Sequence, residues 1–169
     1  MSDSSFPDVR WGSESSILRG PATAFGSTRF GSWMIRSLAG VDRTLLERSR
    51  GRFTVLGPIG LPTVLLNSTG RKSGLRRTSP LLYLRDGDRL VVVGSNFGQA
   101  HHPAWTGNLL ADPQASVTMA GREIEVLATP VTGAEKDRLY TAFVELAGAY
   151  EVYRGRTDRD LRMFALSVR

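Results

Sequence analysis

The sequence predicts an α+β fold: a barrel of about six mostly antiparallel strands with flanking helices. Short runs rich in Val, Leu, Thr and Tyr recur between residues 63 and 130 and again near the end of the chain. These residue types suit a pleated, half-buried surface. Turn signals such as Asp86-Gly87 and Ala120-Gly121 separate neighbouring runs. Apolar residues at helical spacing precede and follow the runs.

The 169 residues are expected to form one domain, residues 28–169, after a flexible segment, residues 1–27, that is rich in Ser, Gly and Asp. Thr28–Arg48 carries one apolar stripe at helical spacing, with arginines mostly off that stripe, which predicts an amphipathic helix. A helix docked on the barrel and a basic helix touching an anionic membrane share this pattern, so both interpretations stay open. Gly51–Pro62 is expected to be a loop.

Six strands and two further helices are predicted after this loop. The strands are Thr63–Ser68, Thr78–Leu84, Leu90–Ser95, Ala115–Met119, Arg122–Pro130 and Met163–Val168. A short helix ending near Asp112 should begin around Pro103, because proline fits the first helical turn. A longer helix is predicted over Thr132–Tyr150. Thr132 followed three residues later by Glu135 has the spacing of a capping box.

The composition excludes several kinds of site. The chain has no cysteine, which excludes disulfides, thiol catalysis and the usual structural zinc sites. The two histidines, His101 and His102, are adjacent and have no clustered carboxylates nearby, so no metal site is expected. Glu123 and Glu125 alternate with apolar residues, which predicts a solvent face and not an acid–base pair. No serine lies in a G-x-S-x-G nucleophile motif.

The charge and the hydropathy pattern bear on location and partners. No run approaches the roughly 18 apolar residues of a membrane span. The N-terminus lacks a basic region followed by an apolar core. We therefore expect a cytoplasmic protein, with contact to a membrane through Thr28–Arg48 as the open alternative. The formal net charge of +6 predicts an anionic partner: nucleic acid, acidic lipid, or an anionic cofactor or substrate.

The turn Gly70–Gly74 is the clearest candidate for anion binding. Its glycines allow backbone N–H groups to converge, and Arg71, Lys72, Ser73 and Arg77 add charged and hydroxyl donors. The spacing is not that of a Walker motif. A solvated basic surface is the competing interpretation. No nucleic-acid partner is expected, because exposed aromatic residues do not alternate with these cations.

Several motifs together resemble one known family. They are TGRKSG at 69–74, RRTSPLLYLRDGDRLVVVGSN at 76–96, HPAW at 102–105 and NLLADP at 108–113. Tyr150 and Tyr153 followed by Thr157-Asp158-Arg159 complete a Y-x-x-Y…T-D-R pattern. This set resembles the deazaflavin-dependent nitroreductase family, and within it the quinone-reductase-like group that uses coenzyme F420. The resemblance implies a split β-barrel.

The resemblance also implies roles for individual residues. The cofactor-binding residues would be Arg71, Lys72, Ser73, Arg77, Pro80, Ser95, Asn96, Gly98, His102, Pro103, Ala104, Trp105 and Asn108. Among them, the basic turn would hold the cofactor's phosphate and acidic tail. Ser95, Tyr150 and Tyr153 would be the catalytic residues, with Ser95 or Tyr150 donating a hydrogen bond to the acceptor.

The implied reaction is hydride transfer from reduced F420 (F420H2) to an electron-poor small molecule: a quinone, a nitro compound or an activated alkene. The cofactor carries the difficult chemistry in such enzymes. Two alternatives remain at this stage: an F420 carrier or binding protein without turnover, and an FMN-dependent enzyme on the same barrel. The physiological acceptor, the length of the cofactor's tail and the oligomeric state are left open by the sequence.

Overall fold

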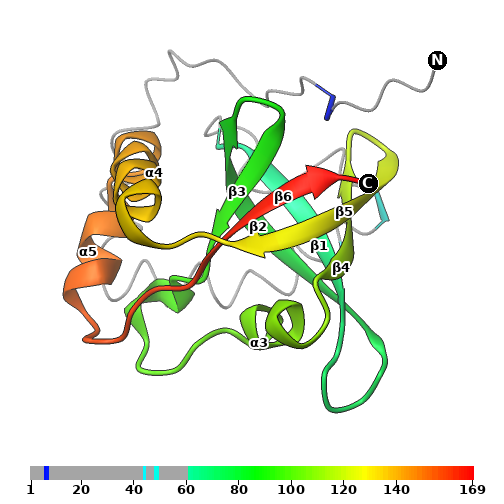
Figure 1. The fold of residues 1–169 in the computed structure, drawn as a ribbon, viewed down its shortest axis with the longest axis horizontal. Coiled ribbons are helices and arrows are strands. Elements are labelled where there is room, and N and C mark those ends of the chain that lie inside the picture. Colours follow the sequence, from blue (N-terminus) through cyan, green and yellow to red (C-terminus); the bar gives the residue numbers. More distant parts are fainter. Residues whose placement is uncertain (1–5, 8–43, 45–47, 50–60) are drawn as a thin grey trace.

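The computed structural model describes residues 6–7, 44, 48–49 and 61–169 (Figure 1). Most of the predicted segment 1–27, of the predicted helix Thr28–Arg48 and of the Gly51–Pro62 loop lies outside the described residues. They stay predictions, as does the division of the chain at residue 28.

Six strands form a closed barrel, which confirms the predicted fold class (Figure 1). The strands are β1 Thr63–Thr69, β2 Arg76–Asp86, β3 Arg89–Val93, β4 Gln114–Met119, β5 Arg122–Pro130 and β6 Met163–Val168. Their order around the barrel is β1-β2-β3-β6-β5-β4, and β4 pairs again with β1. Every neighbouring pair is antiparallel. Arg122–Pro130 and Met163–Val168 match their predicted bounds.

Alternating side chains of the strands fill the interior of the barrel. Val64 and Leu66 of β1 point inward and are fully buried, as the period of two in a strand requires. Trp105 closes the interior from one end and packs on Phe164, with ring centroids 5.9 Å apart. Phe6, 1% exposed, belongs to the same interior cluster. The core of the barrel therefore includes a side chain from far upstream of the first strand.

The outer faces of β3 and β6 are covered by two helices, α4 Gly133–Leu146 and α5 Ala149–Gly155 (Figure 1). The single helix predicted over Thr132–Tyr150 was wrong, because the chain turns at Ala147, which has extended backbone angles. The Tyr140 hydroxyl donates to the Tyr150 carbonyl at 2.7 Å and links the two helices across this turn. Gly148 disfavours continuation of a helix.

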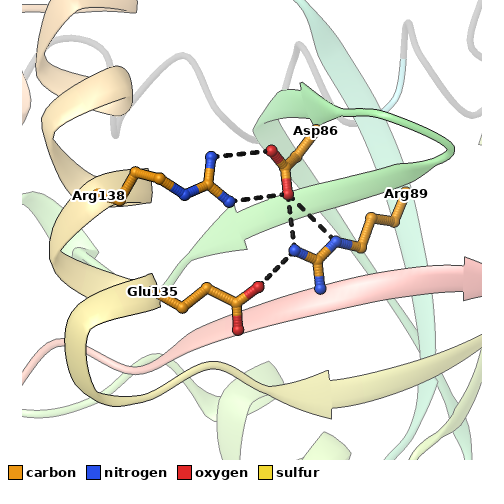
Figure 2. A network of polar contacts seen from close by, with 4 residues as sticks. All are labelled: Asp86, Arg89, Glu135 and Arg138. Carbon is orange, nitrogen blue, oxygen red and sulfur yellow. Dashed lines mark hydrogen bonds and ion pairs between the residues drawn. The ribbon is translucent and has the colours of Figure 1, made fainter.

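The predicted capping box at the start of α4 was also wrong in part. Thr132 is the N-cap residue, but its side chain makes no capping hydrogen bond. Glu135 pairs instead with Arg89 in β3 (Figure 2). The ion pair with Arg89 therefore engages the Glu135 carboxylate, which in a capping box would accept from the backbone N–H of the N-cap residue.

Glu135 and Arg89 belong to a network of four charged residues that fixes α4 to the β2–β3 hairpin (Figure 2). Asp86 accepts hydrogen bonds from Arg138 of α4 at 3.1 and 3.2 Å, and from Arg89 at 2.7 and 3.2 Å. The bonds from Arg138, and then those from Arg89, hold the pKa of Asp86 below its usual value. A shared carboxylate of this kind links two elements more firmly than an isolated surface pair.

The two ends of the barrel differ in what they carry (Figure 1). One end has the β2–β3 and β4–β5 hairpins. The other has the β1–β2 turn, the segment leaving β3, and the helix α3, Ala104–Ala111. Glu123 and Glu125 are exposed on β5, as expected. Among the described residues, no helix is long and apolar enough to cross a membrane, and no group of side chains has the composition of a metal site.

Candidate functional site

A cavity of about 640 Å³ opens at the end of the barrel that carries α3. It is formed where the β1–β2 turn, the segment leaving β3 and the start of α3 meet. Its lining residues are Arg71, Ser79, Asn96, His101, His102, Pro103, Ala104, Trp105 and Arg162. Residues predicted from three separate motifs are therefore brought together around one space.

The β1–β2 turn presents cations beside this cavity. The turn is closed by backbone bonds from Gly74 N to Gly70 O at 2.7 Å and from Gly70 N to Leu75 O at 2.8 Å. Ser73 Oγ accepts from Leu75 N at 3.3 Å and from the Arg77 guanidinium at 3.4 Å. Ser73 therefore shapes the turn and positions one of its cations.

The cations of the turn are available to an anionic ligand. Arg71, Lys72 and Arg77 are all exposed. No carboxylate of the described residues forms a salt bridge with any of the three. A charge-assisted hydrogen bond to an anion is stronger than one between neutral groups, so this turn can hold a phosphate or carboxylate firmly.

The turn and the end of β1 are fastened to α3 through Asn108 and Gly107. The Arg71 backbone N–H donates to Asn108 Oδ1 at 3.1 Å, and Asn108 Nδ2 donates to Ser68 Oγ at 3.3 Å. The Arg71 guanidinium lies directly against Gly107, where an added Cβ atom would be 2.0 Å from Nη1. Asn108 is buried and ties the turn to the helix, without lining the cavity. Gly107, which was not predicted, leaves the space that Arg71 occupies.

The segment leaving β3 has an uncommon backbone. Asn96, Phe97 and Gly98 have φ angles of 46°, 55° and 74°, three left-handed residues in succession. Gly98 is packed so closely on α5 that an added Cβ would lie 2.7 Å from the Tyr153 carbonyl oxygen. The Asn96 amide donates to the His101 carbonyl at 3.0 Å and closes the loop. Asn96 lines the cavity, whereas Gly98 is buried behind it.

The predicted catalytic residues lie behind this segment in an aromatic cluster. Ser95, Tyr150 and Tyr153 are all buried, and none lines the cavity. The ring centroid of Tyr150 lies 5.8 Å from that of Tyr153 and 5.2 Å from that of Phe143. The centroids of Phe97 and Tyr153 are 5.6 Å apart. Burial raises the pKa of Tyr150 well above its usual value, while a hydrogen bond with the Ser95 side chain acts in the opposite direction. Tyr150 is therefore a neutral phenol at physiological pH.

Four further residues of the site were not among the predicted site residues: Ser79, His101 and Arg162, which line the cavity, and Arg159. Ser79 lines the cavity, and its neighbour Pro80, which was predicted, lies on the opposite face of β2 because side chains alternate along a strand. Arg162 also lines the cavity and donates to Thr106 Oγ1 at 3.3 Å. Arg159 contacts the segment leaving β3. The only sequence signal for Arg159 was its place in the T-D-R pattern, which specifies no contact.

Comparison with known proteins identifies the family. The sequence model of the F420H(2)-dependent quinone reductase family matches residues 31–167. The chain belongs to this family. The F420H(2)-dependent quinone reductase Rv1261c of Mycobacterium tuberculosis is 34% identical over 124 residues, which are 72% of this chain and 83% of that protein.

Solved structures agree with the family assignment. The F420-H2 dependent reductase FDR-A is 31% identical, with a TM-score of 0.58 over 63% of this chain and 94% of that chain. A second structure, described as a domain-swapped dimer, is 30% identical, with a TM-score of 0.59 over 74% of this chain and 96% of that one. The family, the split barrel and the enzyme class expected from the resemblance are confirmed: the chain is an F420H2-dependent reductase.

The residues at the cavity suit the cofactor of the family, coenzyme F420. The cofactor combines a flat ring system with a phosphodiester and a glutamate tail. Arg71 lines the cavity, and Lys72 and Arg77 lie outside its lining, in and next to the same turn; none of the three has a described carboxylate partner. The Trp105 and Pro103 side chains add apolar lining. A concave site that combines apolar walls with a few convergent polar and charged groups is the usual form of a cofactor site.

Proposed function

We propose that this reductase holds F420 in the cavity beside α3 and transfers a hydride from F420H2 to a quinone or a similarly electron-poor small molecule. The observation that carries the proposal is the position of the cavity. It lies between the exposed cations of the β1–β2 turn, which have no carboxylate partner among the described residues, and the polar segment that leaves β3. One cleft thus offers an anion site and a ring site side by side.

In this proposal the basic turn binds and orients the cofactor. Arg71 and Lys72 hold the phosphodiester and the acidic tail, while Arg77 is positioned through Ser73. Ser79, Asn96 and the His102–Trp105 segment form the walls on the ring side. When bound, F420H2 supplies the hydride.

The Ser95–Tyr150 pair is proposed to polarise the acceptor. Each of the two hydroxyl groups carries one proton, and the hydrogen bond between them uses only one of the two. The pair therefore keeps a proton for the oxygen of an acceptor that reaches behind the segment leaving β3, where both hydroxyl groups are buried. Because burial keeps Tyr150 protonated, this donor is available throughout the physiological pH range. Tyr153 packs on Tyr150 and limits the positions that its ring can take.

Anaerobic turnover tests the proposal. F420H2 is mixed with the enzyme and with menadione, a nitroaromatic or an enone in separate reactions, and the absorbance of oxidised deazaflavin is followed. We expect its return above the enzyme-free rate with at least one acceptor, and no reaction when NADPH replaces F420H2. Tight F420 binding without turnover on all three acceptors would favour the carrier alternative. Binding of FMN but not F420 would overturn the proposal.

A peripheral membrane contact is proposed on the sequence alone, because a lipid quinone is found in the membrane. The apolar stripe and the arginines of Thr28–Arg48 are its basis. Co-sedimentation with anionic vesicles should fall with added salt and when Arg36 and Arg43 are replaced by glutamine. Equal sedimentation of the variant and the wild type would exclude this contact.

A further inference from the structure

Arg159 makes four polar contacts with the segment that leaves β3. Its Nη1 donates to the Gly94 carbonyl at 2.9 Å, and its Nη2 donates to the Ser95 carbonyl. Its Nε donates to the Gln99 carbonyl at 2.8 Å. Nη1 also lies 3.1 Å from Nδ1 of His102. One rigid guanidinium therefore donates hydrogen bonds to backbone carbonyls on both sides of a single turn. A lysine, with one donor nitrogen, cannot make this set of bonds.

The turn between those carbonyls is the left-handed run Asn96–Gly98. Non-glycine residues avoid this conformation, and it persists only where the surroundings over-determine it. Within the described residues, β3 ends at Val93, so the carbonyls of Gly94 and Ser95 lie beyond the strand ladder. Arg159 supplies a donor to each of them, and the Ser95 carbonyl also accepts from the Gly98 N–H at 2.9 Å within the turn.

The charge of Arg159 is directed to this segment and not to an acidic partner. No described carboxylate forms a salt bridge with it. The neighbouring Asp160 pairs with Lys136 of α4. Arg159 is half-buried, and desolvation, together with the charge of Arg162, lowers its pKa, although an arginine stays protonated at any physiological pH. Four contacts to carbonyls and an imidazole take the place of an ion pair.

The contact with His102 has a chemical consequence. Because a protonated guanidinium can only donate, Nδ1 of His102 must accept, and the imidazole is then neutral with its proton on Nε2. His102 lines the cavity.

The electrostatic surroundings keep His102 in this neutral state. Burial lowers its pKa below the usual value, and the charges of Arg162, Arg159 and Lys136 lower it further, whereas Asp160 opposes them.

We propose that Arg159 is a positioning residue for the cofactor cleft: it holds the Gly94–His102 segment in its left-handed form and presents His102 to the cavity as a neutral Nε2–H donor. The ligand of this donor would be an acceptor oxygen or nitrogen of the bound cofactor. The proposal rests on the proposed function only for the identity of that ligand. The tautomer and the loop geometry do not depend on turnover.

Nitrogen NMR of the histidine side chains tests this directly. The chain has two histidines, so His101→Gln assigns the signals of His102. In the ligand-free wild type, His102 should show the Nε2–H tautomer and titrate below the ordinary histidine value. Arg159→Met should raise the pKa of His102 and populate the Nδ1–H tautomer, and F420 affinity should fall by roughly tenfold or more.

Two further variants keep the test decisive. Arg159→Lys retains the charge but has one donor nitrogen in place of the fork, so the tautomer should become mixed although the fold is kept. Arg122→Met, an exposed arginine at the opposite end of the barrel, should leave His102 and the F420 affinity unchanged. A protonated or Nδ1–H form of His102 in the wild type would overturn the proposal. So would wild-type His102 signals in folded Arg159→Met. Neither the NMR signals of His102 nor the F420 affinity depends on an electron-accepting substrate. A failure of the proposed reduction is therefore distinguishable from a failure of this proposal.

Discussion

Replacing Gly107 with alanine would put a methyl group where the Arg71 guanidinium now lies. The three atoms nearest to an added Cβ all belong to Arg71, with Nη1 at 2.0 Å and Cζ at 2.9 Å. Non-bonded heavy atoms pack at about 3.5–4.0 Å, so the guanidinium has to move by roughly 1.5 Å. Arg71 is exposed and can swing outward, so the helix itself is not expected to yield.

The affinity for F420 should then fall, while the thermal stability of the protein should rise. A hydrogen bond from a charged donor to an anion contributes about 1.5–3 kcal/mol, so displacing Arg71 should weaken F420 binding by about tenfold or more. Alanine in the interior of a helix is more stable than glycine by about 0.5–1 kcal/mol. The variant should therefore unfold at a temperature roughly 1–4 °C higher than the wild type.

The assay is a fluorescence titration with F420 and a thermal melt on the same preparation. Gly155→Ala is the matched control, because an added Cβ in that position of α5 meets no atom within 4 Å. An unchanged Kd in a folded Gly107→Ala variant would refute the role of Arg71 in binding. A lower melting temperature would refute the claim that the clash is relieved by Arg71 alone.

Four further predictions follow from the same contacts. Lys72→Ala should weaken F420 binding by about tenfold, measured by fluorescence titration, and an unchanged Kd would remove Lys72 from the anion site. Tyr150→Phe should alter turnover or the acceptor KM while F420 affinity stays within about threefold; a cofactor Kd that moves as far as for Lys72→Ala would contradict this division of roles. Phe6→Ala should cost about 3–5 kcal/mol in chemical denaturation, because the side chain is 1% exposed within the barrel, and wild-type stability would show that Phe6 does not fill the core. Asp86→Asn should lower the melting temperature at neutral pH. Because the pKa of Asp86 is held below its usual value, its stabilisation is fully present above that usual value and is lost as the pH falls through the lowered pKa, so the variant and the wild type should converge in acid.

Local patterns predicted the barrel well. Alternating apolar residues and turn dipeptides are set by neighbours in sequence, so the strands Arg122–Pro130 and Met163–Val168 were found at their observed bounds. The break at Ala147 was missed because a tertiary contact, from Tyr140 to the Tyr150 carbonyl, fixes the turn there. The burial of Phe6 was missed for the same reason, since nothing near it in the sequence indicates a distant core.

The cavity was predicted less completely than the fold. The motifs that resemble the family include Arg71, Asn96 and His102, and the structure brings these together. Sequence patterns could not show that the Arg71 guanidinium lies against Gly107 of α3, because the two residues are far apart in the sequence and meet only when the barrel has formed. The T-D-R pattern includes Arg159 but could not show its contacts, since three of them are with backbone carbonyls, which carry no sequence signature.

The most direct test of the central claim is a parallel equilibrium titration of the protein with F420 and with FMN at two salt concentrations. The basic turn is exposed and, on this account, binds a cofactor with several negative charges, so F420 should bind more tightly than FMN, and its affinity should fall as salt screens the turn. FMN binding as tight as F420 binding, or F420 affinity that does not change with salt, would contradict the claim that this turn and cavity form an F420 site.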